Sequence, residues 1–550
     1  MFSIFCKLMM FIFPLLVAVQ ASIALATSPT VSLDSATATG VTEGLVSSFY
    51  GIPYAQPPTG DRRFRAPVPI PPYTGSIDAT SIKPACPQQK SDTFKREGNT
   101  EEVNTFLAEN FEPVNAPEAE DCLHINVLKP IDATPESKLP VLVWFFGGGF
   151  QTGSAISRLT PGNVIVKRSL ELNQPVIHVS MDYRSNGFGF MASKEVKAAG
   201  VGNIGLRDQR EALRWVQKYI GAFGGDPTKV TIWGQSSGAI SVALQMVTNS
   251  GNTEGLFRAA FMHSGATVPV GDITNGQNYY DQIVSDTGCS GSADTLACLR
   301  RVSYQSLMDA INKTPGISSY QSLRLTWLPR VDGDFLTDIP SNLVQQGKIA
   351  NIPFVSGNCD DEGTFFSGSS LNVTDDAQFR EYLKFLLPSD IPDADIDEIT
   401  RVYPSDVTQG SPYDTGTSNA RTPQYKRIAS VQGDMVFQGP RRFFVQSLNG
   451  RQNTWSFLSK RLKFIPNLGS FHGSDLLSVY GGYDMTDYLV RFATNLDPNG
   501  DTGIYWPKYT TAAPSLLTFK TGIQPLEITQ DAYREEALKV ATRVLMEHPM

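Results

Sequence analysis

Runs of uninterrupted apolar residues recur along the chain, and stretches with helical spacing lie between them. The apolar runs have strand length and cover residues 141–146, 176–180, 230–233, 259–262 and 352–356. The helical stretches cover 207–222 and 239–247. Strands that are apolar throughout are buried on both faces, which is typical of a parallel sheet covered by helices. The pattern therefore predicts an α/β fold with a large, mostly parallel central sheet, in which ligands bind beyond the C-terminal ends of the strands.

A Gly-x-Ser-x-Gly motif, Gly234 to Gly238, joins the predicted strand 230–233 to the predicted helix 239–247. Glycine makes up 46 of the 550 residues, so the motif alone is a weak signal and an ordinary Gly/Ser loop is the alternative. The context is stronger, because a sharp strand-to-helix turn strains its central residue and needs small residues on either side. The sequence predicts Ser236 as a nucleophile.

A serine nucleophile needs a base, an acid that orients the base, and N–H donors for the oxyanion. Three glycines follow the predicted strand 141–146, and their backbone can turn N–H groups toward a small ligand. We predict that Gly148, Gly149 and the N–H of Ser237 form the oxyanion hole. The alternative is a flexible turn before Phe150.

The base is predicted from chain order, which in sheet enzymes with this turn is serine, acid, histidine. That order excludes the first two of the five histidines, and the third leaves no room for an acid after Ser236. The fifth lies at a chain end, where termini fray. His472 remains, between Gly469 and Gly473. The acid is expected in 358–364, after the strand 352–356, where Asp360, Asp361 and Glu362 compete and spacing does not choose among them. The five histidines are His124, His178, His263, His472 and His548.

The first residues indicate an exported protein. Residues 1–26 contain an apolar core and end in a small-residue cleavage site, which predicts a signal peptide. A membrane anchor is the alternative, but the run is shorter than the ~20 apolar residues that span a bilayer. No linker or repeat divides 27–550, so a single domain is expected. The net charge of −8 has no basic run, which argues against a nucleic-acid partner. We expect a secreted protein without a stable membrane anchor.

Export implies an oxidising compartment, in which cysteines pair. Sequence neighbours suggest the bridges Cys86–Cys122 and Cys289–Cys298, which leave Cys359 as a free thiol. Two glycosylation sequons begin at Asn312 and Asn372.

Taken together, the motifs resemble the type-B carboxylesterase/lipase family of α/β-hydrolases, especially secreted fungal lipases of the Candida and Geotrichum type. The resemblance covers nearly all of the mature chain. It implies an α/β-hydrolase fold with a lid insertion in 86–122, no cofactor and no metal. It also implies Glu362 as the acid, His472 as the base and the two bridges named above. The supporting segments are 49–55, 120–123, 147–150, 203–209, 223–227, 234–238, 361–364 and 471–473.

This resemblance predicts a secreted serine carboxylic-ester hydrolase, a lipase that acts on acylglycerols or related lipophilic esters through an acyl-enzyme, at a lipid–water interface. An esterase for steryl, feruloyl or soluble short-chain esters is the alternative within enzymes. A non-catalytic, cholinesterase-like binding or adhesion protein is the alternative of another class. Two positions depart from the family, which usually has Glu and Ala where this chain has Gln235 and Ser237.

The lid and the acyl-binding residues are predicted least specifically. Four apolar residues at helical spacing among glutamates suggest a small amphipathic helix in the lid, with a fixed surface helix as the alternative. They are Val103, Phe106, Leu107 and Phe111. The substrate-binding candidates, most of which match acyl-channel positions of the fungal lipases, are Phe150, Leu323, Leu325, Phe365 and Phe366.

Overall fold

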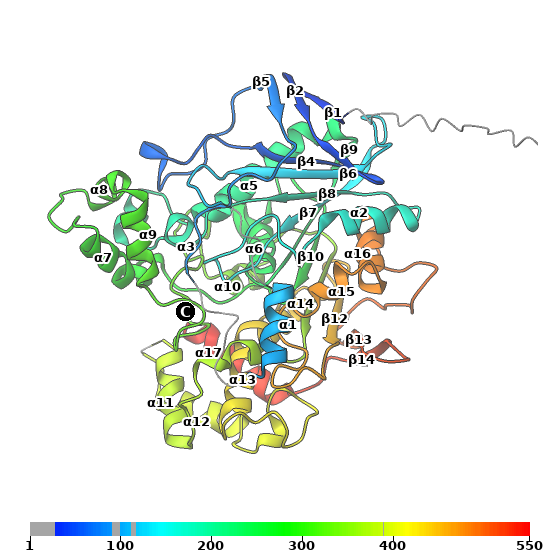
Figure 1. Ribbon diagram of the computed structural model, residues 1–550. Coiled ribbons are helices and arrows are strands. Elements are labelled where there is room, and N and C mark those ends of the chain that lie inside the picture. The colour runs from blue at the N-terminus through cyan, green and yellow to red at the C-terminus, as the bar shows by residue number, and fades with distance from the viewer. Residues whose placement is uncertain (1–27, 91–98, 112–116, 389) are drawn as a thin grey trace, which may run out of the picture.

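A computed structural model describes residues 28–90, 99–111, 117–388 and 390–550. The predicted signal peptide, 1–26, lies outside the described residues. Within them, eleven strands form one mixed sheet through the middle of the molecule (Figure 1). In spatial order its strands are β14 (Leu526–Gln530), β13 (Ser515–Lys520), β12 (Thr454–Lys460), β11 (Phe354–Cys359), β10 (Ala259–His263), β9 (Gly225–Gln235), β7 (Leu139–Phe145), β8 (Ile177–Met181), β6 (His124–Pro130), β4 (Val46–Pro53) and β3 (Val41–Glu43).

The middle of this sheet is parallel and its edges are antiparallel. The strands from β13 through β12, β11, β10, β9 and β7 to β8 run in one direction, and every residue of β8, β10 and β11 is buried. The register pairs Phe145 with Gly234 and Met262 with Gly234, so β7, β9 and β10 end at one edge of the sheet. The predicted α/β architecture is confirmed. A small second sheet contains β1 (Thr30–Leu33), β2 (Ser35–Thr39) and β5 (Thr74–Asp78).

Helices cover both faces of the large sheet (Figure 1). α2 and α16 pack on one face, whereas α5, α6 and α14 pack on the other, with α10 against α6 and α14. The α-helices are α1 (Glu101–Phe111), α2 (Gly162–Glu171), α3 (Asn186–Phe190), α4 (Lys194–Ala198), α5 (Ile204–Tyr219), α6 (Ser237–Val247), α7 (Gln277–Asp286), α8 (Thr295–Arg301), α9 (Tyr304–Asn312), α10 (Pro340–Gln345), α11 (Asp376–Leu386), α12 (Asp393–Val402), α13 (Tyr425–Gly433), α14 (Gly439–Ser447), α15 (Leu476–Val479), α16 (Asp484–Asn495) and α17 (Glu535–Glu547).

A second apolar cluster lies under the C-terminal part of the sheet. Helices α11, α12, α13 and α17 contribute most of its buried side chains (Figure 1). The short 3-10 helix η5 (Glu362–Phe365), which follows β11, packs directly on α13. This packing fixes the segment that carries the three competing carboxylates.

The predicted elements are present, with different ends. Each of the five predicted strands lies on an observed strand, and the predicted helix 207–222 is α5 followed by the 3-10 helix η2 (Ile220–Phe223). Strand β9 is much longer than the predicted run 230–233, because it begins in the polar turn at Gly225. The amphipathic helix expected in the lid is α1, whose Val103 and Leu107 are buried.

Candidate functional site

Ser236 lies at the sharp turn between β9 and α6. Its backbone has φ 58° and ψ −130°, a strained conformation for a residue with a side chain. A β-carbon at Gly234 would lie 2.6 Å from the carbonyl carbon of Gly238, and one at Gly238 would clash with the oxygen of Phe145. The two glycines are therefore needed for strand and helix to pass this closely. Ser236 is held by its N–H, which donates to the oxygen of His263 at 2.9 Å.

Glu362 and His472 are brought together from segments 110 residues apart. Glu362 Oε2 lies 2.6 Å from His472 Nδ1. The other carboxylate oxygen, Oε1, accepts from the backbone N–H of Cys359 at 2.7 Å and from Asn358 Nδ2 at 3.2 Å. The side chain of Glu362 is only 1% exposed, so these donors replace the water that an ionised carboxylate would otherwise bind.

Asp360 and Asp361, the other two candidates for the acid, contact groups other than His472. Lys463 Nζ lies 2.6 Å from Asp360 Oδ2 and 2.8 Å from Asp361 Oδ2. Asp361 also accepts from the backbone N–H groups of Ser470 and Tyr413, each at 2.8 Å, and thereby joins the His472 loop to a neighbouring loop. Burial and the adjacent charge of Asp360 raise the pKa of Asp361 to about 6. Of the three carboxylates, Glu362 alone bonds to His472.

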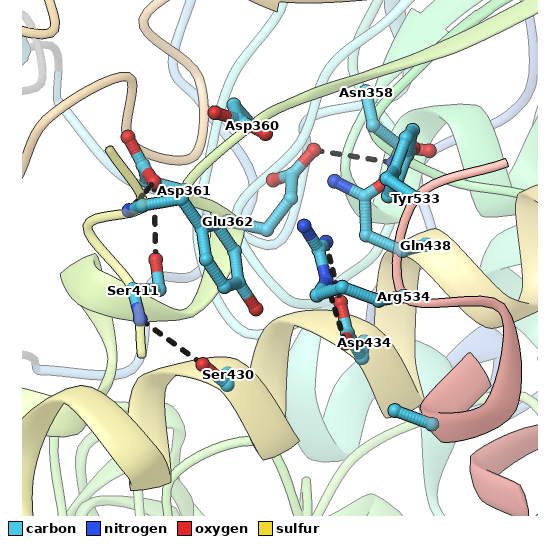
Figure 2. A network of polar contacts seen from close by, with 12 residues as sticks. Asn358, Asp360, Asp361, Glu362, Ser411, Ser430, Asp434, Gln438, Tyr533 and Arg534 are labelled. Atoms are coloured by element: carbon cyan, nitrogen blue, oxygen red, sulfur yellow. Dashed lines mark hydrogen bonds and ion pairs between the residues drawn. The ribbon is translucent and has the colours of Figure 1, made fainter. Parts of the chain in front are cut away.

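Figure 2 shows the polar network around these carboxylates. Asp361 accepts from Ser411 on one side, while Glu362 accepts from Asn358 on the other. Below them, Arg534 pairs with Asp434 at 2.8 Å. Asn358 is itself oriented, because its Oδ1 accepts from Arg441 Nε at 3.0 Å, so its NH2 group must face Glu362.

The glycine loop 147–149 follows β7 beside Ser236. A β-carbon at Gly147 would lie 3.0 Å from Ser236 Cβ, which places this loop against Ser236. Gly148 and Gly149 have φ of 114° and 63°, values that side chains rarely adopt. Among the described residues, neither of their N–H groups donates to another backbone or side-chain acceptor. Two free donors therefore lie at the start of α6, where the helix dipole also favours negative charge.

Comparisons with known proteins agree with this geometry. The model of the carboxylesterase family matches residues 28–540. The chain belongs to the carboxylesterase family. Lipase 4 of Diutina rugosa is 44% identical over 512 residues, which cover 90% of this chain and 92% of the relative. The secreted triacylglycerol lipase of Gibberella zeae is 40% identical over 528 residues, which cover 92% and 89%. The crystal structure of Aspergillus niger EstA has a TM-score of 0.80 at 26% identity, covering 95% of this chain and 99% of that one. This carboxylesterase is an α/β-hydrolase that acts on carboxylic esters.

Gln235 occupies a position next to His472 that sequence analysis did not foresee. Its Nε2 lies 3.2 Å from His472 Nε2. Among the residues that the structure describes, His472 bonds to Gln235 and Glu362, and no hydrogen bond joins it to Ser236 Oγ. Gln235 is 5% exposed and packs beside Gly473, where a β-carbon would lie 3.4 Å from its Nε2.

A second buried histidine–carboxylate pair lies behind His472. Asp475 Oδ2 lies 2.7 Å from His263 Nδ1, and the thiol of Cys359 donates to Asp475 Oδ1 at 3.5 Å. Burial acts to raise the pKa of Asp475, but the hydrogen bond from His263 and the nearby imidazoles hold it below its ordinary value. A negative charge therefore faces His472 from behind. In the sequence, the position of Asp475 three residues after His472 was the only indication of this charge.

The predicted substrate-binding residues lie in two overlapping places, because Leu323 also packs in one apolar cluster with Phe366 and Phe365. Phe150, Leu323 and Leu325 line one small apolar cavity, next to Ile240 on α6. Phe365 and Phe366 do not line that cavity. Phe366 instead packs against the ring of His472 at 5.1 Å, and Phe365 stacks on Phe471 at 6.1 Å between ring centroids. The second pair therefore supports the histidine loop.

Helix α1 covers this region from the front (Figure 1). Its Val103 and Leu107 form a cluster with Ile465 and Phe471, and Phe111 lies 5.4 Å from the ring of Phe471. The bridge Cys86–Cys122 closes the loop that contains α1. Cys289–Cys298 is also formed and Cys359 is free, as predicted. None of the helices in the described ranges is long and apolar enough to cross a membrane.

Proposed function

We propose that this carboxylesterase hydrolyses esters in two steps, with Ser236 as nucleophile, His472 as base and Glu362 as the acid that orients it. The observation that carries the proposal is the 2.6 Å contact between Glu362 Oε2 and His472 Nδ1, on a loop next to the strained Ser236. An ionised carboxylate can only accept, so Nδ1 carries its proton and Nε2 is left as the acceptor. This is the tautomer that a general base requires.

In the first step, Ser236 Oγ attacks the ester carbonyl and its proton passes to His472 Nε2. We assign the N–H groups of Gly148, Gly149 and Ser237 to the oxyanion, and the support for this is that the N–H groups of Gly148 and Gly149 donate to no acceptor among the described residues and that donors of this kind stabilise the developing negative charge. His472 then gives the proton to the departing alkoxide, which leaves as an alcohol. In the second step, His472 takes a proton from water, the resulting hydroxide attacks the acyl-enzyme, and the carboxylic acid leaves as Ser236 regains its proton.

Asp475 supports the charged intermediate from behind. As His472 becomes an imidazolium, the negative charge of Asp475 lowers its energy together with Glu362. His263 keeps Asp475 in place through the 2.7 Å contact.

Acylglycerols are the substrates that we propose. Phe150, Leu323 and Leu325 line a cavity that is apolar but small, so it takes the end of an acyl chain, and α1 serves as a lid over the site. We also propose secretion as one catalytic domain, 27–550, after removal of residues 1–26. Of the two sequon asparagines, Asn372 is exposed, whereas Asn312 is half-buried and accepts from the N–H of Lys90.

The nucleophile is tested with Ser236→Ala and a matched control, Ser241→Ala, which changes a buried serine one turn further along α6. The first variant should lose all but a trace of p-nitrophenyl butyrate hydrolysis and should not react with a serine-directed organophosphate. The control should keep both activities. A folded Ser236→Ala protein with more than a few per cent of the activity would refute the assignment. Wild-type protein inert to both reagents would favour a binding or adhesion protein.

The substrate class is tested with tributyrin. A lid that opens at an interface predicts a rise in rate as tributyrin passes its solubility limit. Smooth saturation below that limit, with faster turnover of soluble, steryl or feruloyl esters, would favour an esterase.

A further inference from the structure

A hydrogen bond to His472 Nε2 identifies Gln235 as a further residue that acts on the proposed base. His472 Nδ1 donates to Glu362, so the lone pair of neutral His472 lies on Nε2. Gln235 Nε2 lies 3.2 Å from this atom and can only donate. If the amide were turned, its oxygen would face the same lone pair, and the two acceptors would repel. The orientation seen here is therefore the one that neutral His472 selects.

We propose that Gln235 is a positioning residue for the base: its amide holds Nε2 of neutral His472, releases it when Ser236 transfers its proton, and leaves the imidazolium without a third carboxylate. The proposal rests on the roles assigned to Ser236 and His472 above.

The first consequence concerns rate. Nε2 must accept the proton of Ser236, yet in this structure the acceptor is used by Gln235. The bond is buried, with Gln235 5% and His472 9% exposed, so water cannot replace it at no cost. Breaking one neutral hydrogen bond before the acylation step slows that step by about fivefold.

The second consequence concerns pH. Among the described residues, two charged groups act on His472: Glu362 of η5, and Asp475, which lies three residues after His472 in the sequence. Asp475 is bound in turn by His263 of β10. The rings of Phe366 and Phe437 cover another side. A carboxylate at position 235 would add a further negative charge and favour the imidazolium. The neutral amide of Gln235 adds no such charge beside Nε2.

The test uses the full-length secreted protein and two variants, Gln235→Glu and Gln235→Met. Gln235→Glu should move the acid limb of the kcat/KM profile for p-nitrophenyl butyrate to higher pH by about one to two units. Gln235→Met has a similar volume and no donor, so phosphorylation of Ser236 by diethyl p-nitrophenyl phosphate at pH 8 should be about fivefold faster per folded molecule. Gln245→Met, a buried glutamine further along α6, should leave both measurements at their wild-type values.

Each measurement can overturn the proposal. A nearby charge is expected to move the acid limb of kcat/KM by ~1 pH unit or more. If the acid limb of Gln235→Glu lies within about 0.3 pH unit of the wild-type limb, well below that shift, position 235 does not control the pH range. A phosphorylation rate that is unchanged or slower in Gln235→Met would exclude the hold-and-release role. Thermal unfolding and titration of reactive serine restrict the comparison to folded protein. If wild-type protein neither hydrolyses the ester nor reacts with the phosphate, the proposed function itself fails.

Discussion

A buried aspartate behind the glycine loop gives a quantitative prediction for stability against pH. Asp182 follows β8 and is 6% exposed. Its Oδ1 accepts from the backbone N–H of Ala155 at 2.9 Å, and no cation pairs with it among the described residues. The next residue, Tyr183, stacks on Phe146 and donates its hydroxyl to the Phe146 oxygen at 2.7 Å. Asp182 is thus next to the residue that packs against the start of the proposed oxyanion loop.

Burial raises the pKa of Asp182 from 3.8 to about 7. Three units at about 1.4 kcal/mol each amount to about 4 kcal/mol. Because the pKa is raised in the folded state, the folded protein prefers the protonated acid. The contribution of Asp182 to stability is therefore fully present below about pH 4, falls as pH rises, and is lost above about pH 7. Asp182→Asn keeps an oxygen acceptor for Ala155 and cannot ionise.

The stability of Asp182→Asn relative to wild type should therefore increase by about 4 kcal/mol from pH 4 to pH 8. Using an unfolding entropy of roughly 2 cal/mol/K per residue, this corresponds to a relative rise in Tm of about 4 °C. The measurement is Tm by scanning calorimetry across this range at one scan rate. Asp531→Asn is the control: Asp531 is also buried, but Arg441 and Arg442 hold its pKa low, so its loss should destabilise by a constant amount above pH 5. A Tm difference for Asp182→Asn that does not change with pH would refute the reasoning.

Three further predictions test the site and its frame. Glu362→Gln should lower kcat by about 10³- to 10⁴-fold, whereas Asp361→Asn should keep kcat within about tenfold and lower Tm; similar losses of kcat in both would contradict the assignment of the acid. Gly148→Ala should lower kcat by about 10²- to 10³-fold with little change in KM, since a β-carbon there would clash with a backbone oxygen of its own loop; an unchanged kcat would remove Gly148 from the hole. Replacing Cys86 and Cys122 by serine opens a bridge with a sequence separation of 36 and should cost about 3–4 kcal/mol of stability, and an unchanged urea midpoint would show that the bridge adds nothing.

The apolar runs in the sequence predicted the parallel strands at the middle of the sheet, but they did not predict β12. Strands such as β10 are built from apolar residues, and their burial follows from composition. In β12, Thr454, Ser456 and Ser459 are buried as completely as their apolar neighbours. Ser456 Oγ donates to the backbone oxygen of Ser356 at 2.7 Å, which offsets the burial of its hydroxyl. Hydropathy cannot show this, because it depends on a partner 100 residues away.

The same limit applies to the candidate site. His472 was predicted among five histidines from three considerations: the order of nucleophile, acid and base along the chain, the room that an acid needs after Ser236, and the place of the last histidine at a chain end. They could not show that Asp475 meets His263 across 212 residues, or that Gln235 reaches His472 across 237. Those contacts depend on how three loops converge at the sheet edge, which no local pattern records.

The three consecutive carboxylates show why a site needs more than the right residue type. Asp360, Asp361 and Glu362 leave the end of β11 in different directions and meet different groups. Asp361 is fixed by two backbone N–H groups and Lys463, and so ties loops together. Glu362 receives N–H groups on one oxygen only, which leaves Oε2 for His472. A carboxylate whose oxygens are all occupied stabilises the fold, whereas one with a free oxygen aimed at an imidazole can orient a base. The division of roles follows from the donors around each acid and not from the acids themselves.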